Sequence, residues 1–419
     1  MLDFNAHTDA LRNVLEDRNS LKKALFKTYG EQRLTREDRD DVKNTISVIL
    51  RHFFKLTYEA NNLLPSFSER DFEHYLALIC LAKIRYMKER KENVAPRLEK
   101  SFSDHLLITD VKSFENVLFE AVKTPFSIPE DIKRYPSVYL SLTLDVPDFL
   151  ITRIYDEYER DTALKIVKSL HDSPDTFFVG NNYGEPLEDT YSYDGELGLY
   201  RIERFTDLKG KDDFKQGKLI LAKPVEKEAF DACNLNSLEE SILLINQRMP
   251  DFASFIDSKL HEKELVKIDS NYPKDENYRR AVEYDERRGM KRINNILSPL
   301  NLVKTFVEFD SYDAVFVNGE DLQIGRSGMR KEVLPCLREK DFKVSFTREL
   351  GALKESSYFV KPDGLLVLIN SALTAEETTN VSKAFLEANK RFVLVEEKTI
   401  LPFEHKSEGG YYSIFRRMQ

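Results

Sequence analysis

Leu365-Leu-Val-Leu-Ile369 is an apolar run that is followed by a helical pattern over Ala375–Ala388 and by a second apolar run, Phe392–Glu396. Short apolar runs that alternate with helical patterns are typical of a largely parallel sheet covered by helices. Thr374 and Glu377 have the spacing of a capping box, which predicts that the intervening helix begins there. This stretch therefore predicts an α/β fold.

The same rhythm extends from about Ala229 to the end of the chain. The strand candidates are Leu265–Ile268, Leu302–Phe309, Ala314–Val317, Leu365–Ile369, Phe392–Glu396 and Tyr411–Phe415. Only Pro402 and the Gly409-Gly410 turn separate the last two runs, so these strands should pair antiparallel. We expect a doubly wound sheet that ends in an antiparallel hairpin.

The first part of the chain has a helical period. Apolar residues recur at three- and four-residue steps from His7 to about Leu98, and Thr35 with Asp38 resembles the start of a helix. The segment Phe72–Met87 is a further amphipathic stretch. These patterns predict an all-helical bundle.

A different composition lies between the bundle and the sheet. Proline residues punctuate a connector, and two short amphipathic helices are predicted over Phe149–Tyr158 and Thr162–Leu170. A loop-like region, Ser173–Gly198, precedes strand-like runs at Leu199–Arg204 and Lys218–Ala222. We expect a small α+β subdomain, and hence a multidomain chain divided into residues 1–124, 125–224 and 225–419.

The composition bounds the protein class. An apolar fraction of 41% and a charged fraction of 32% over 419 residues predict a globular protein with more than one core. Three separated cysteines support neither a disulfide framework nor a Cys-based zinc site. We find no signal segment and no membrane span, and we expect a cytoplasmic monomer. The net charge of −9 requires any RNA contact to come from local basic patches.

Three stretches resemble one family in order and spacing. Phe230-Asp-Ala-Cys233 resembles "L-D-A-C", Tyr312–Asn318 resembles the strand that runs into "D-A-P-C-S-G-x-G", and Lys361–Leu373 resembles "K-P-G-G-x-L-V-Y-S-T-C-S-L". These are motifs of the bacterial ribosomal RNA cytosine-5 methyltransferases of the Sun/Fmu type. The resemblance implies a NusB-like helical domain, an RNA-binding subdomain and a Rossmann-like class I methyltransferase domain that uses S-adenosylmethionine.

The resemblance also locates the catalytic positions. The family uses paired cysteines, and these fall on Asp321 and Ser371, with Gly325 in register and Glu376-Glu377 at the family's acidic pair. A thiolate must add to the cytosine ring, and neither a carboxylate nor an unactivated hydroxyl replaces it. We therefore predict that both positions are inactive.

The cofactor motif departs from the family as well. The resemblance places Asp231 and Asp269 at vestigial cofactor-binding positions, Asp269 at the end of the second strand. The segment after Cys233 lacks the family's glycines, and Leu235, Ser237 and Leu238 carry side chains there while Glu239 replaces a lysine. We predict no bound cofactor, with S-adenosylmethionine expected only if the enzyme is active.

Other chemistry has little support. Cys233, at an expected strand end, and Cys336, on a helical stretch, are more typical of small buried residues than of nucleophiles. The seven histidines form no metal-ligand spacing, so no metal is predicted.

Basic residues are the remaining candidate for function. Arg326, Arg330, Lys331 and Arg338, with Lys340 and Lys343, cluster after the second motif and are predicted to contact RNA. Two further clusters are Arg279, Arg280, Arg287, Arg288, Lys291 and Arg292, and Lys83, Arg85, Lys88, Arg90 and Lys91. Each cluster can alternatively be a solvated helix face paired with interspersed carboxylates.

We predict an RNA-binding relative of the methyltransferases that has lost catalysis, with ribosomal RNA or a small-subunit precursor as its partner. Two alternatives remain open: an active S-adenosylmethionine-dependent rRNA cytosine-C5 methyltransferase, and a protein-interaction scaffold that does not bind RNA.

Overall fold

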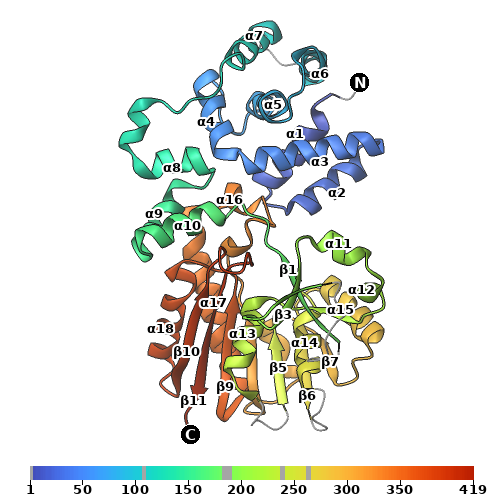
Figure 1. The fold of residues 1–419 in the computed structure, drawn as a ribbon, viewed down its shortest axis with the longest axis vertical. Coiled ribbons are helices and arrows are strands. Elements are labelled where there is room, and N and C mark those ends of the chain that lie inside the picture. The colour runs from blue at the N-terminus through green and yellow to red at the C-terminus, as the bar shows by residue number, and fades with distance from the viewer. Residues whose placement is uncertain (1–2, 106–109, 182–190, 236–240, 261–265) are drawn as a thin grey trace. The chain divides into compact units, whose positions relative to one another are not determined.

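The computed structural model describes residues 3–105, 110–181, 191–235, 241–260 and 266–419. It divides into two compact units, one formed by residues 1–171 with 329–339 and the other by residues 172–328 with 340–419 (Figure 1). The three-domain division of the sequence analysis is finer than these two units and stays a prediction. None of the described helices combines the length and the hydrophobicity that a bilayer crossing requires.

The first unit is helical throughout its described residues. Its elements are α1 (Asn5–Leu15), α2 (Leu21–Glu31), α3 (Arg36–Arg51), α4 (Phe53–Leu63), α5 (Phe72–Leu81), the π-helix η1 (Ala82–Tyr86), α6 (Lys91–His105), α7 (Val111–Ala121), η2 (Glu130–Arg134), α8 (Pro136–Leu144), α9 (Asp148–Glu157), α10 (Arg160–Ser169) and α16 (Val333–Cys336). The expected helix start is confirmed, because Thr35 and Asp38 form a reciprocal capping box. The helical bundle is confirmed, whereas its NusB-like character stays a prediction.

The second unit contains two sheets. The smaller sheet has the order β2-β3-β1-β4, formed by β1 (Thr176–Gly180), β2 (Ser192–Asp194), β3 (Leu199–Ile202) and β4 (Leu219–Leu221), and α11 (Phe205–Gly210) and α12 (Asp212–Lys215) lie between β3 and β4 in the chain. The predicted strands β3 and β4 are confirmed. The region predicted to be a loop contains β1 and β2 as well.

The larger sheet has the order β10-β11-β9-β8-β5-β6-β7. Its strands are β5 (Ser241–Ile245), β6 (Lys267–Tyr272), β7 (Ile293–Leu297), β8 (Tyr312–Asn318), β9 (Val360–Asn370), β10 (Phe392–Ile400) and β11 (Gly410–Arg417). All neighbouring pairs from β9 to β7 are parallel. β11 is antiparallel to β9 and to β10, as predicted for the terminal hairpin.

Helices cover both faces of this sheet (Figure 1). α13 (Pro224–Ala232) and α14 (Asp251–Lys259) pack on the face that carries Ile242 and Leu244. α17 (Glu339–Ser356) and α18 (Thr379–Ala388) pack on the face that carries Leu243 and Ile245. The remaining elements are α15 (Asp275–Arg288), η4 (Leu300–Thr305), η5 (Ile324–Arg326), η6 (Ser357–Phe359) and η7 (Ala375–Glu377). Alternate strand residues thus bury opposite faces, as a doubly wound sheet requires.

Two local predictions are wrong. The run Leu302–Phe309 is not a strand, because the chain forms the 3₁₀ helix η4 there and leaves Leu302, Phe306 and Phe309 exposed. The helix near Ala375 does not begin at a capping box, because the Thr374 side chain accepts no backbone hydrogen bond and η7 intervenes before α18. In both places the chain forms a short 3₁₀ helix, which is wound more tightly than the α-helix or strand predicted there.

Candidate functional site

The strand order reverses between β5 and β8. From β5 the chain moves outward to β6 and β7, and it then returns to place β8 on the other side of β5. In open α/β sheets, ligands bind at such a switch point, outside the carboxyl ends of the strands. A cofactor is therefore expected at the segments that follow Ile245 and Asn318.

The segment after β5 is the turn 246–250, Asn-Gln-Arg-Met-Pro. It contains no glycine, and Asn246 adopts a left-handed backbone with φ of 57°. The turn is held in place because Asn271 accepts a hydrogen bond from the Asn246 N–H through its side chain (3.2 Å) and one from the Gln247 N–H through its carbonyl (2.8 Å). A glycine-free turn leaves little room for backbone amides to approach a charged ligand.

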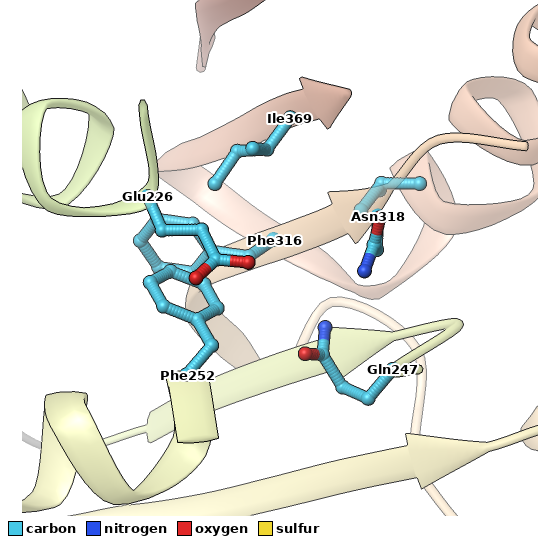
Figure 2. A pocket seen from close by; sticks show the side chains of 7 residues that line it. Glu226, Gln247, Phe252, Phe316, Asn318 and Ile369 are labelled. Carbon is cyan, nitrogen blue, oxygen red and sulfur yellow. The ribbon is translucent and has the colours of Figure 1, made fainter. Parts of the chain in front are cut away.

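The cavity at this switch point is small (Figure 2). It is lined by Glu226, Gln247, Phe252, Phe316, Val317, Asn318 and Ile369 and has an empty volume of about 190 Å³. The rings of Phe252 and Phe316 lie edge to face, with centroids 5.4 Å apart. Pockets that bind drug-sized ligands enclose roughly 300–1,000 Å³. This cavity is smaller than that range.

The expected first motif is not a strand. Phe230-Asp-Ala-Cys233 forms the end of helix α13, where Pro224 occupies the first turn and Val225, Ala229 and Phe230 are buried. The strand that begins the parallel sheet is β5 instead. Ser237, Leu238 and Glu239, which were expected in the cofactor loop, lie outside the described residues, whereas Leu235 is buried in the core below α13.

Asp231 consequently lies on a helix. Its carboxylate forms ion pairs with Lys227 (2.5 Å) and with Lys259. Lys259 also lies over the rings of Phe230 and Phe255, and burial lowers the Lys259 pKa to about 8. The placement gives no support to a cofactor role for Asp231.

Asp269 lies inside β6 and not at its end. It pairs in register with Leu243 and Asn294, three residues before Tyr272 ends the strand. Its carboxylate is buried and accepts hydrogen bonds from Tyr312 Oη (2.5 Å) and Asn294 Nδ2 (2.6 Å), and Lys267 lies 2.7 Å away. Because Asp269 lies within β6, the expected position at the strand end is wrong. Its hydrogen-bond partners also occupy the carboxylate.

The two positions of the family's cysteines lie side by side. The Ser371 N–H donates to Asp321 Oδ2 (3.0 Å), and the Gln323 N–H donates to the same oxygen (2.9 Å). The Asp321 side chain is 1% exposed. The segments that carry Asp321 and Ser371 are closely packed. The Gly325 N–H donates to the Ser371 carbonyl, and a Cβ at Gly325 would lie 2.2 Å from the Gly409 carbonyl oxygen.

Two glutamates complete a buried carboxylate cluster with Asp321. Burial and then the charge of Asp321 raise the pKa of Glu377 to about 8. Burial, then the charges of Asp321 and Glu377, raise the pKa of Glu349 well above its ordinary value. Glu377 therefore holds its proton at neutral pH, and the shift at Glu349 likewise favours its protonated form. Among the described residues, no group of His, Cys, Asp and Glu side chains has the arrangement of a metal site.

Hydrogen bonds fix each glutamate in position. Glu377 Oε1 accepts from Ser345 Oγ (2.5 Å) and from the Leu322 N–H (2.8 Å). Glu349 Oε2 accepts from Asn370 Nδ2 (2.8 Å). The cluster thus joins three elements: the segment after β8 with Asp321, α17 with Glu349, and η7 after β9 with Glu377.

One cation approaches the cluster from the turn after β5. Arg248 lies 3.6 Å from Asp321 Oδ1 and donates to the Gly319 carbonyl oxygen (2.7 Å). Sequence reasoning missed Arg248 and Glu349. The apolar run 241–245 followed by a Pro-containing turn would have identified β5 and hence Arg248.

The described thiols offer no nucleophile at this site. Cys233 is buried at the end of α13, where burial raises the pKa of its thiol. Burial likewise raises the pKa of Cys336 to about 12, and its Sγ donates to the Val14 carbonyl oxygen (3.3 Å). A thiol with a raised pKa is a poor nucleophile at neutral pH.

The residues predicted to contact RNA are divided between the two units. Arg326 belongs to the second unit and pairs with Glu408 (2.9 Å). Arg330, Lys331 and Arg338 belong to the first unit. Arg330 pairs with Glu332 (3.1 Å), and Arg338 is exposed.

The other two basic clusters are largely paired with carboxylates. On α15, Arg279 pairs with Asp275, Arg280 with Glu276 and Arg288 with Asp251, and Arg292 beyond it pairs with Asp257. In the first unit, Lys83 is buried against Asp41 (2.7 Å) and Glu89 (3.2 Å), and Arg85 pairs with Glu59. These contacts favour the alternative interpretation, in which each cluster is a helix face paired with carboxylates.

No family model matches this chain, and no curated relative matches it. Solved structures resemble it in fold. PH0851 has a TM-score of 0.75 at 14% identity, with 98% of each chain covered. The methyltransferase homolog protein from Pyrococcus horikoshii has a TM-score of 0.56 at 12% identity and covers 68% of this chain and 99% of its own.

NSun6 from Pyrococcus horikoshii, solved with SFG, has a TM-score of 0.50 at 12% identity, with 64% of this chain and 98% of that chain covered. At such identities the likeness concerns the fold alone. The chain therefore has a methyltransferase-like fold, with a parallel seven-stranded sheet whose terminal strand β11 is antiparallel, preceded by a helical unit.

Proposed function

We propose that this protein binds RNA and does not methylate it. The observation that carries the proposal is the carboxylate cluster at the positions of the family's two cysteines, where Asp321 is buried against the backbone of Ser371. The fold is that of a methyltransferase, while the group that would attack the base is missing. We propose ribosomal RNA or a small-subunit precursor as the RNA, and a cytoplasmic monomer as the acting form.

The chemistry of the site supports the loss of catalysis. Attack on the cytosine ring needs a thiolate, and loss of a covalent nucleophile lowers turnover by many orders of magnitude. Burial favours the protonated, neutral form of both Glu349 and Glu377, which is a poor nucleophile. Asp321 Oδ2 accepts from two amide N–H groups, and Oδ1 faces Arg248.

The cofactor region supports the same proposal. The turn after β5 has no glycine, and Phe252 and Phe316 line the small cavity at the switch point. Phe252 and Phe316 belong to the core cluster, so enlarging this cavity for S-adenosylmethionine would disturb closely packed core residues. We therefore propose that this fold is kept for recognition and not for group transfer.

The test combines two measurements on the full-length protein. Transfer of labelled methyl groups from S-adenosylmethionine to unmodified ribosomal RNA is expected to be absent, and crosslinking to the same RNA is expected to be present. Methylated cytosine in the product would establish the active enzyme instead. Absence of both methyl transfer and crosslinking would leave the protein-interaction scaffold.

A further inference from the structure

Polar side chains meet between strands β6 and β7 and helices α14 and α15 (Figure 1). Ser270 of β6 and Asn295 of β7 are register partners in the parallel sheet. Tyr272 lies two residues after Ser270, so the side chains at both positions point to the same face of the sheet. Ile268 shares that face and packs in one core cluster with residues of α14. The polar groups therefore lie in the layer between the sheet and its helices.

Helix α15 contributes Asp285 and Arg288 to this layer. Asn295 Nδ2 donates to Asp285 Oδ2 (2.7 Å), which ties α15 to β7. Arg288 lies three residues after Asp285, on the same side of the helix. It donates through its terminal nitrogens to Asp251 Oδ1 (3.0 Å) and Ser254 Oγ (3.1 Å) of α14. These contacts bring both strands and both helices to one place, which we call the α15 polar site.

The α15 polar site contains buried atoms without hydrogen-bond partners among the described residues. These atoms are Ser270 Oγ, Tyr272 Oη, Asp285 Oδ1, Arg288 Nε and Asn295 Oδ1. Burial raises the pKa of Tyr272 and the nearby Ser270 hydroxyl opposes that shift, but the two hydroxyls do not meet the geometry of a hydrogen bond. Ser270 and Tyr272 are 0% exposed. Since a buried polar group without a partner costs free energy, native proteins satisfy nearly all such groups.

The chemistry of these atoms selects what can satisfy them. Arg288 Nε can only donate, Asn295 Oδ1 can only accept, and the two hydroxyls can do either. Burial raises the pKa of Asp285 to about 6, so its carboxylate is mostly ionised at neutral pH and accepts. A metal cation would contact the oxygens alone and would be repelled by the Arg288 guanidinium. Water both donates and accepts, and it is small enough for an interior site.

We propose that ordered water molecules occupy the α15 polar site and bridge α15 to β6 and β7. An interior water makes about three hydrogen bonds, so the unpaired atoms at this site suit a small group of waters. These waters add to the direct Asn295–Asp285 hydrogen bond in fixing α15 on the sheet. The water site is independent of RNA binding and of methyl transfer.

A crystal structure of the full chain, at a resolution that shows ordered water, tests the proposal directly. Water density is expected at hydrogen-bond distance, about 2.7–3.2 Å, from Tyr272 Oη and Asp285 Oδ1. A direct hydrogen bond from Arg288 Nε to Asp285 Oδ1, with no density beside Tyr272, would overturn it. Density that lies roughly 2.3–2.6 Å from several oxygens would indicate a bound cation and would overturn it as well.

Thermal melting of Tyr272→Phe gives a second readout. If water satisfies the Tyr272 hydroxyl, its removal should lower the melting temperature by a few degrees, because a hydrogen bond is lost and the water loses a partner. If the site is dry, the same change removes an unsatisfied polar group and should raise the melting temperature. Tyr193→Phe is the control, since Tyr193 is exposed in the same unit and its variant should melt as wild type does. An unchanged or raised melting temperature for Tyr272→Phe would contradict the water site.

Discussion

Glu377→Gln should make the protein more stable at neutral pH. Glu377 is buried and its pKa is raised from 4.5 to about 8, so the folded state holds a proton that the unfolded state releases. Stability is therefore fully present below about pH 4.5 and falls as pH rises towards 8. One pKa unit corresponds to about 1.4 kcal/mol, so by pH 7 the loss is on the order of 3 kcal/mol.

Glutamine retains the neutral shape of the protonated acid. Its Oε1 can still accept from Ser345 Oγ and from the Leu322 N–H, while it carries no titratable proton. The variant should match wild type at pH 4.5 and exceed its free energy of unfolding by on the order of 3 kcal/mol at pH 7.

Urea unfolding at a series of pH values measures this difference. Glu320→Gln is the matched control, because Glu320 is exposed in the same loop, and its profile should follow wild type. A Glu377→Gln curve that runs parallel to wild type from pH 4.5 to 8, or lies below it at pH 7, would refute the description of Glu377 as a buried protonated acid.

Three further outcomes are expected. The variant D321C/S371C places cysteine at both positions and should not produce methyl transfer, because the cavity at the switch point stays small; labelled product from this variant would contradict that reasoning. Arg288→Ala should lower the free energy of unfolding in urea by roughly 3–5 kcal/mol, since it leaves a buried carboxylate without its partner; a change below 1 kcal/mol would disprove the role of this pair. Gly325→Ala should cost about 3 kcal/mol in the same assay, because its Cβ would strike the Gly409 carbonyl, and wild-type stability would show that the loop is looser than the structure indicates.

Parts of the fold could be predicted from local pattern. The apolar runs within β8, β9, β10 and β11 are short, uniform and flanked by turn residues, and the Gly409-Gly410 turn indicated the antiparallel pairing. The helical period of the first unit was equally clear. These features depend on residues close in sequence, so the sequence carries them directly.

The first motif could not be assigned in this way. Phe230-Asp-Ala-Cys233 and Ser241–Ile245 are both short apolar runs, and such runs fit a buried helix turn or a strand. Pro224 at the start of α13 was the available signal for a helix. Because we assigned the first strand to Phe230–Cys233, we predicted that Asp231 lies at the sheet, and we did not identify Arg248.

The sequence by itself determined that cysteine is missing where the resemblance requires it, and that alternating strands and helices would form a sheet covered on both faces. Only the tertiary structure decided that Asp321, Glu349 and Glu377 share one buried cluster. The physical reason is that the pKa and the partners of a side chain depend on burial and on neighbouring charges, which chain folding brings together from distant positions.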